Sequence, residues 1–267
     1  MKENKLYIVE GLPCSGKSTT CKYVADILRF SGRKVVHIDE GTGKHPADYE
    51  FQSFISKKAL AEFSKEEQEI ILECSKSNND GYIVELSLLY GELFDKALNY
   101  KIYDFLDWEI ENEIMLEKWR EFANGCGDNV YVFNCCLLQN PMCETMMRFG
   151  FDIQVSKKYI LEICNIIKEL NPIVIYLANS DVKTSISNTC HERGSEWLNS
   201  VIDYHVNGVY GKEHKLAGFD GYISCLEERQ RRELEIIKEL PVKSLVIENA
   251  HEDWKNAYNT IHEFIIT

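Results

Sequence analysis

Three features are missing from this sequence of 267 residues, and each absence excludes a class of protein. No apolar run approaches the ~20 residues that a membrane-spanning helix requires. The opening segment Met-Lys-Glu-Asn-Lys lacks the apolar stretch of a signal peptide, so we expect a cytoplasmic protein with no membrane partner. The third missing feature is the C-x-x-C pair. The 10 cysteines are scattered, and we expect reduced, mostly buried thiols rather than disulfides or zinc ligands.

Positive charge is also scarce. The sequence has 30 lysines and arginines and 43 acidic residues, which gives a net charge of −13 at pH 7. A protein that binds nucleic acid needs a basic face, so we expect no nucleic-acid partner and a small-molecule substrate instead. The length suits a single α/β domain, residues 1–267, with an elaboration. Composition leaves the oligomeric state open.

The clearest positive signal is KLYIVEGLPCSGKSTT, where an apolar run from Leu6 to Val9 leads into a glycine-rich turn. The spacing of a glycine, four residues and then Gly-Lys-Ser is that of a P-loop. Gly11 lets the chain leave a strand sharply, and Gly16 brings backbone N–H groups close to phosphate oxygens. The predicted nucleotide-binding residues are Gly11, Pro13, Cys14, Ser15, Gly16, Lys17, Ser18 and Thr19.

The segment after the turn has the apolar spacing of an amphipathic helix. The unpaired N–H groups and the dipole of such a helix favour a polyphosphate anion at its N-terminus. We predict that Lys17 reaches the β- and γ-phosphates and that the Ser18 hydroxyl is a ligand of Mg²⁺. The sequence therefore predicts a site for ATP or GTP, and we take ATP and Mg²⁺ as the expected cofactors.

A second set of candidates follows the run KVVHID, which we predict to be a strand buried on both faces. Asp39 and Glu40 come at its carboxyl end, the edge of a parallel sheet where ligands bind. We predict Asp39 in the water shell of Mg²⁺ and Glu40 as a substrate-binding residue and general base, although either acid could be the base. The alternative is a turn with two solvated acids.

The rest of the chain predicts further strands at VYVFNCC, PIVIYLANSD and LVIE, separated by helices. Residues of about 45–125 are predicted to form a helical insertion, in which Ser64 opens a helix with a capping box. Residues of about 190–225 are predicted to form a helical lid. Glu85 in the insertion is a candidate substrate-binding residue. Arg148 is another, and its alternative is an i,i+4 surface ion pair with Glu144.

This order of elements resembles the P-loop kinases of the thymidylate kinase and deoxynucleoside kinase type, in the P-loop NTPase superfamily. IVEGLPCSGKST looks like the strand and loop of that family, IDEG is similar to the place of its acidic base, and HERG looks like the start of its lid. The resemblance implies an α/β, three-layer P-loop NTPase fold with a mainly parallel five-stranded sheet, and catalytic roles for Lys17, Asp39, Glu40 and Arg193. Only the P-loop is a specific match.

One departure concerns the end of the third strand, where these families usually place an acidic residue and this sequence has Asn134-Cys135-Cys136. We therefore carry three hypotheses. The first is a kinase that transfers the γ-phosphoryl group of ATP to a nucleoside or nucleotide. The second is a kinase of another hydroxyl compound, such as a metabolite or an antibiotic, as in shikimate kinase. The third is an ATP-binding protein regulated by nucleotide, with no phosphoryl acceptor.

Overall fold

The computed structural model describes residues 3–193 and 195–266, without the side chains of 189–195. The chain divides into two compact units. The larger unit combines Met1–Glu40 with Trp119–Thr267, and the smaller unit is Gly41–Lys118.

The larger unit is built on a five-stranded sheet with the strand order β2-β6-β1-β7-β8. All four strand pairs are parallel. The strands are β1 (Leu6–Gly11), β2 (Val35–Ile38), β6 (Val130–Asn134), β7 (Ile173–Ala178) and β8 (Lys243–Glu248). This sheet confirms the predicted α/β fold class with five parallel strands.

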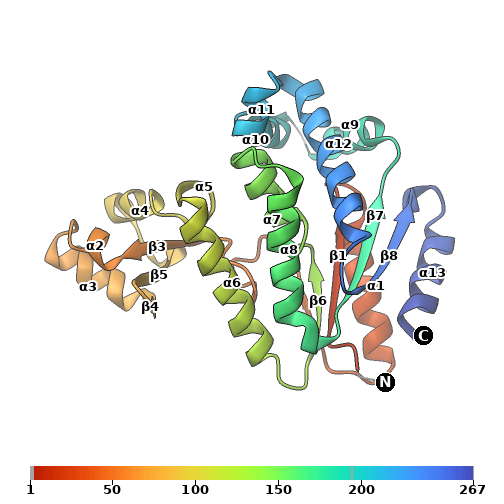
Figure 1. The fold of residues 1–267 in the computed structure, drawn as a ribbon, viewed down its shortest axis with the longest axis horizontal. Helices are drawn as coiled ribbons and strands as arrows, with labels where there is room; N and C mark the ends of the chain where they lie inside the picture. Colours follow the sequence, from red (N-terminus) through yellow and green to blue (C-terminus); the bar gives the residue numbers. More distant parts are fainter. Residues whose placement is uncertain (1–2, 194, 267) are drawn as a thin grey trace. The chain divides into compact units, whose positions relative to one another are not determined.

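Helices cover both faces of this sheet, which makes the larger unit three layers thick. On one face α1 (Lys17–Phe30) and α13 (Trp254–Ile266) share a hydrophobic core with alternate residues of β1, β6 and β7. α8 (Ile153–Ile167) and α12 (Gly218–Ile237) cover the other face (Figure 1). The Tyr176 hydroxyl on β7 donates a hydrogen bond of 2.6 Å to Glu233 on α12, which joins that face to its helix.

Two sequence predictions about this unit need correction. β2 is half-buried rather than buried on both faces, because it is an edge strand with β6 as its neighbour. α8 begins at Ile153, three residues before the predicted start at Ser156, because the Asp152 carboxylate caps the N–H groups of Gln154 and Val155.

The remaining elements of the larger unit are mostly helical. α6 (Trp108–Gly125) starts in the smaller unit and ends in the larger one. The others are α7 (Gln139–Met142), the π-helix η2 (Cys143–Arg148), η3 (Lys168–Leu170), α9 (Val182–Arg193), α10 (Ser195–Val206), α11 (Val209–Glu213) and η4 (Ala250–Glu252).

The smaller unit contains an antiparallel sheet of order β3-β5-β4, so the prediction of a purely helical insertion is wrong. The predicted capping box at Ser64 is confirmed, but its helix ends at Glu73 and a strand follows. Ile55, Ile71 and Val84 are buried in the core of this unit. Its elements are β3 (Gln52–Ser56), α2 (Lys57–Leu60), α3 (Lys65–Glu73), β4 (Ser75–Asn78), β5 (Gly81–Glu85), η1 (Leu86–Leu88), α4 (Gly91–Leu98) and α5 (Ile102–Phe105).

Two further expectations concern the chain as a whole. Within the described residues, no helix combines the length and the apolar character needed to cross a bilayer. The cysteines whose side chains are described are all free thiols, and most of them are buried, as the sequence predicted.

Candidate phosphate-binding site

The predicted P-loop connects the carboxyl end of the central strand β1 to the N-terminus of α1. Gly11, Cys14 and Gly16 all have positive φ angles, of 144°, 68° and 91°. A Cβ atom at Gly11 would lie 2.6 Å from the carbonyl oxygen of Leu177, and one at Gly16 would lie 2.3 Å from the Trp254 ring. Close packing, in addition to backbone conformation, therefore requires glycine at both positions.

Lys17 is the first residue of α1, and its side chain is 7% exposed. Its ammonium donates hydrogen bonds to the carbonyl oxygens of Gly11 (3.1 Å) and Leu12 (3.0 Å). Ser18 and Thr19 are exposed on the same first turn, which carries no acidic residue. The positive end of the helix dipole and a lysine ammonium thus belong to one turn, an arrangement that favours an anion.

Asn134, the last residue of β6, occupies the position where the sequence lacks the expected acid. Its Nδ2 donates a hydrogen bond of 3.0 Å to the Ser18 hydroxyl. Asn134 is 4% exposed, and its Oδ1 has no hydrogen-bond partner among the described residues. A buried, unpaired amide oxygen beside the predicted Mg²⁺ ligand fits an oxygen-ligated cation or its water shell.

The structure describes no group of three or more histidine, cysteine or acidic side chains placed to hold a metal ion. The donors near the loop fit Mg²⁺ nevertheless, because this ion keeps several waters and takes other ligands from substrate phosphates. Ser18 and Asn134 are the residues that would hold it.

Asp39 and Glu40 leave the end of β2 in different directions. The Asp39 carboxylate is exposed and lies 3.4 Å from Nε2 of His37. The Glu40 carboxylate accepts a hydrogen bond from the side-chain amide of Gln139, at the start of α7. The structure therefore separates the two acids, as the hypothesis of distinct roles requires, although neither role is tested by it.

A buried polar cluster of Glu10, Gln139, Tyr176, Arg229 and Glu233 lies beside the loop. The Glu10 carboxylate on β1 accepts hydrogen bonds from the backbone N–H groups of Leu137 (2.7 Å), Leu138 (2.9 Å) and Gln139 (3.3 Å). Two residues with positive φ, Cys135 and Cys136, turn the chain between β6 and these donors. Burial, followed by the nearby charge of Glu233, raises the pKa of Glu10 to about 7.

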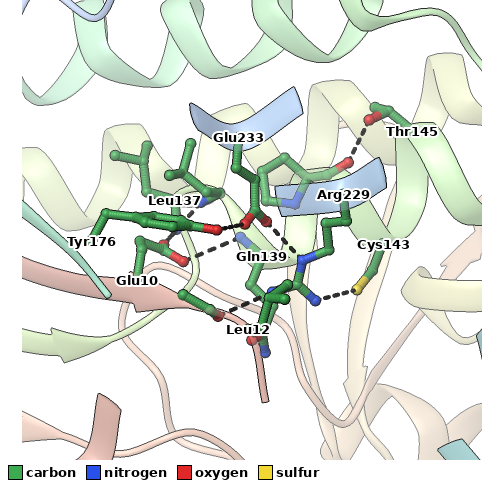
Figure 2. Close-up of polar contacts among 12 residues, drawn as sticks. Glu10, Leu12, Leu137, Gln139, Cys143, Thr145, Tyr176, Arg229 and Glu233 are labelled. Atoms are coloured by element: carbon green, nitrogen blue, oxygen red, sulfur yellow. Dashed lines mark hydrogen bonds and ion pairs between the residues drawn. The ribbon is translucent and has the colours of Figure 1, made fainter. Parts of the chain in front are cut away.

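Arg229 is the cation of this cluster, and its side chain is 1% exposed. Its Nε donates to Glu233 at 2.7 Å, and its Nη2 donates to the carbonyl oxygen of Gly11 (3.2 Å) and to Oε1 of Gln139 (3.3 Å). Figure 2 shows Arg229 and Tyr176 on either side of the Glu233 carboxylate. Burial is the largest single influence on Arg229 and opposes its charge. The surrounding groups, Glu233 first, together outweigh burial and raise the pKa, so the guanidinium stays charged.

Sequence reasoning missed this cluster. Glu10 could have indicated it, because a carboxylate inside an apolar strand needs buried partners. Arg229 and Glu233 could also have indicated it, because they stand four residues apart on a helix. Gln139 gave no signal, since its partners are 90 or more residues away in the sequence.

The other predicted site residues have less support. Arg148 donates to Glu144 at 2.8 Å, and Glu144 is buried, so the i,i+4 pair exists but is not a surface pair. Glu85 ends β5 in the smaller unit and accepts a hydrogen bond from Ser87. Arg193 ends α9, and its side chain lies outside the described residues. Their roles in binding or catalysis stay predictions.

No protein-family model matches the chain, and no curated protein matches it. One similar solved structure is that of the YorR protein from Bacillus subtilis in complex with phosphorylated GDP. It is 14% identical, with 98% of this chain and 93% of that chain covered and a TM-score of 0.40. That score is too low to support an argument about ligand or function. The class of the chain follows from its own strand order and glycine-rich loop: it is an α/β fold with a P-loop-like turn after the central strand.

Proposed function

We propose that this chain binds ATP with Mg²⁺ and transfers the γ-phosphoryl group to a small-molecule acceptor, with nucleosides and nucleotides as the first candidates. The observation that carries the proposal is the pairing of Ser18 with Asn134 at a glycine-rich helix N-terminus that also holds Lys17. Glu40, linked to the same loop through Gln139 and Arg229, supplies a carboxylate for the acceptor side.

In this proposal the residues act mainly by positioning and charge neutralisation. Lys17 and the loop N–H groups hold the β- and γ-phosphates, and Ser18, Asn134 and the more distant Asp39 hold Mg²⁺ and its waters. When bound, Mg²⁺ neutralises charge on the phosphate oxygens. Glu40 takes the proton of a hydroxyl acceptor, and Arg193 stabilises the transferred charge. A phosphate acceptor requires no base.

The neutral side chain of Asn134 is also compatible with a different class of function. An amide beside Ser18 supplies no negative charge, whereas an acid is usual in the kinases that the sequence resembles. A protein in which ATP sets conformation without phosphoryl transfer would tolerate this neutral residue. A kinase of another hydroxyl compound also remains an alternative, because Glu40 fits any hydroxyl acceptor.

A screen of ATP consumption distinguishes these functions. Purified protein with Mg-ATP would be mixed in turn with nucleosides, nucleotides, sugars and aminoglycosides, and ADP release would be measured. The proposal expects one acceptor class to raise ADP release well above the rate without acceptor, and to yield a phosphorylated product. Binding of ATP with no stimulation by any acceptor would contradict the kinase and favour the regulated ATP-binding protein.

A further inference from the structure

Gln139 stands between two groups that fix the orientation of its side-chain amide. On one side its Oε1 accepts a hydrogen bond of 3.3 Å from Nη2 of Arg229. On the other side its Nε2 donates to Oε1 of Glu40. A guanidinium can only donate and an ionised carboxylate can only accept, so this chemistry leaves one orientation for the amide.

The Arg229 end of this connection is immobilised by buried contacts. The guanidinium is held by Glu233, which in turn accepts a hydrogen bond from Tyr176, and both side chains are fully buried. The same Nη2 that contacts Gln139 also donates to the carbonyl oxygen of Gly11 at the start of the loop. The backbone N–H of Gln139 is held separately by Glu10.

We propose that Gln139 is a positioning residue for Glu40, and that Arg229 couples its orientation to the phosphate-binding loop. Glu40 is exposed at the end of an edge strand, where a free glutamate side chain would sample several rotamers. The hydrogen bond from Gln139 selects one of them and directs the carboxylate relative to Gly11. The inference deepens the proposed function and rests on it for its catalytic meaning.

Side-chain amide NMR tests the contact without any activity. The chain has five glutamines, at positions 52, 68, 139, 154 and 230, so a protein labelled with ¹⁵N-glutamine gives five amide pairs. The Gln139 pair is identified by its absence from a Gln139→Met variant. We expect Glu40→Ala, which adds no glutamine to these five, to move the Gln139 pair at a fixed pH and to leave the other four pairs in place.

Other titratable groups lie around Gln139 and Glu40, and their effects must be separated from that of Glu40. Glu10 and Arg229 contact Gln139, and Glu233 pairs with Arg229. Burial raises the pKa values of the neutral thiols of Cys135 and Cys143, which lie close enough to Glu40 for its charge to raise them further. The Glu40→Ala comparison makes this separation, because it changes Glu40 alone. A Gln139 pair that stays in place in Glu40→Ala overturns the proposal.

Kinetics with the acceptor found in the screen tests the catalytic meaning. Gln139→Met is expected to lower kcat about 10-fold or more with a hydroxyl acceptor and to change the KM for ATP far less. The matched control is Gln230→Met, which also removes an amide that bridges two groups, the backbone N–H and C=O of Asn179. Thermal melts of both variants separate this effect from a loss of stability.

Gln139→Glu gives a second readout, because it keeps an acceptor for Arg229 and loses the donor to Glu40. It should move the acidic limb of the pH–rate profile to higher pH, since a carboxylate then faces Glu40. Equal kcat values in Gln139→Met and Gln230→Met, or an unmoved limb in Gln139→Glu, would overturn the positioning role. If no acceptor raises ATP consumption, the proposed function fails, whereas the NMR comparison of wild type and Glu40→Ala still decides the contact.

Discussion

The P-loop and the buried polar cluster beside it are both polar, but they are built in opposite ways. The loop is one continuous segment from Gly11 to Thr19, and its Ser18 and Thr19 side chains are exposed. The cluster brings together β1, β7, α12 and the turn after β6, with side chains that are almost fully buried. In our proposal this difference corresponds to two tasks: the loop offers donors to a ligand, whereas the cluster satisfies its own groups and fixes the backbone around the loop.

The largest effect on activity is expected from Lys17→Ala in the loop. Removing the ammonium takes a positive charge from the predicted phosphate site, so ATP turnover should fall by about 10³-fold. The melting temperature should fall only modestly, because the variant loses two hydrogen bonds from the nearly buried lysine to loop carbonyls. Turnover assays and thermal melts on the same samples check both parts. Wild-type turnover in this variant would remove the loop from the mechanism.

The cluster should respond in the opposite way, through stability. Arg229→Met leaves the buried Glu233 without its cation and should lower the free energy of unfolding by about 3–5 kcal/mol. The double variant Arg229→Met with Glu233→Leu should recover much of this loss, because it removes both charges. Urea unfolding of the two variants and the wild type gives the comparison. A loss below about 1 kcal/mol in the single variant would show that the Arg229–Glu233 ion pair contributes little to the stability of the fold.

Glu40 contacts the cluster through Gln139, and its expected effect is specific for the acceptor. Glu40→Gln should slow transfer to a hydroxyl acceptor by about 10²-fold, because it removes the general base. Transfer to a phosphate acceptor should be unchanged. A pH–rate profile with each acceptor is the measurement, and an unchanged rate with an unchanged acidic limb for the hydroxyl acceptor would make the assignment wrong.

The smallest effect concerns the pH dependence of the cluster. Burial raises the pKa of Glu10 from an ordinary 4.5 to about 7 in the folded protein, so the folded state holds a proton that the unfolded state releases. Glu10 therefore favours folding most below its unfolded pKa, and this contribution is lost as pH rises toward 7. Relative to Glu10→Gln, the wild type should lose stability between about pH 5 and pH 8.

Urea unfolding of both proteins at the two pH values measures this difference. Other groups with shifted pKa values, such as Asp48 and His205, are present in both proteins and cancel. A stability difference that stays constant with pH, or that moves in favour of the wild type as pH rises, would contradict the raised pKa of the buried Glu10.

The same contrast explains how much of the fold could be predicted from sequence. β1, the loop and α1 were predictable because their signals are local: an apolar run, two glycines at a fixed spacing and a helical period. The position of β2 at the edge of the sheet could not be predicted, because an apolar run does not show which strands are its neighbours. The antiparallel sheet was also missed, because Ser75–Asn78 has no apolar alternation and pairs only through β5.

For the candidate site, the sequence indicated the residues that we propose to face a ligand, and it missed the buried residues around them. Lys17 and Ser18 belong to a motif whose chemistry requires them at fixed positions. Gln139 and Arg229 belong to no motif, and their contacts depend on chain segments 90 residues apart. The sequence shows that Asn134 stands where an acid was expected. The hydrogen bond between Asn134 and Ser18 could be found only in the structure.

The most direct test of the account is a calorimetric titration of Mg-ATP into three proteins: the wild type, Lys17→Ala and Lys22→Ala. Lys22 is the matched control, since it is an exposed lysine on the same helix α1. The account predicts that the wild type and Lys22→Ala bind Mg-ATP with the same affinity, and that Lys17→Ala binds at least about 10-fold more weakly, a loss of ~1.4 kcal/mol. Absence of binding to the wild type, or equal affinity in all three proteins, would contradict a phosphate-binding role for this loop.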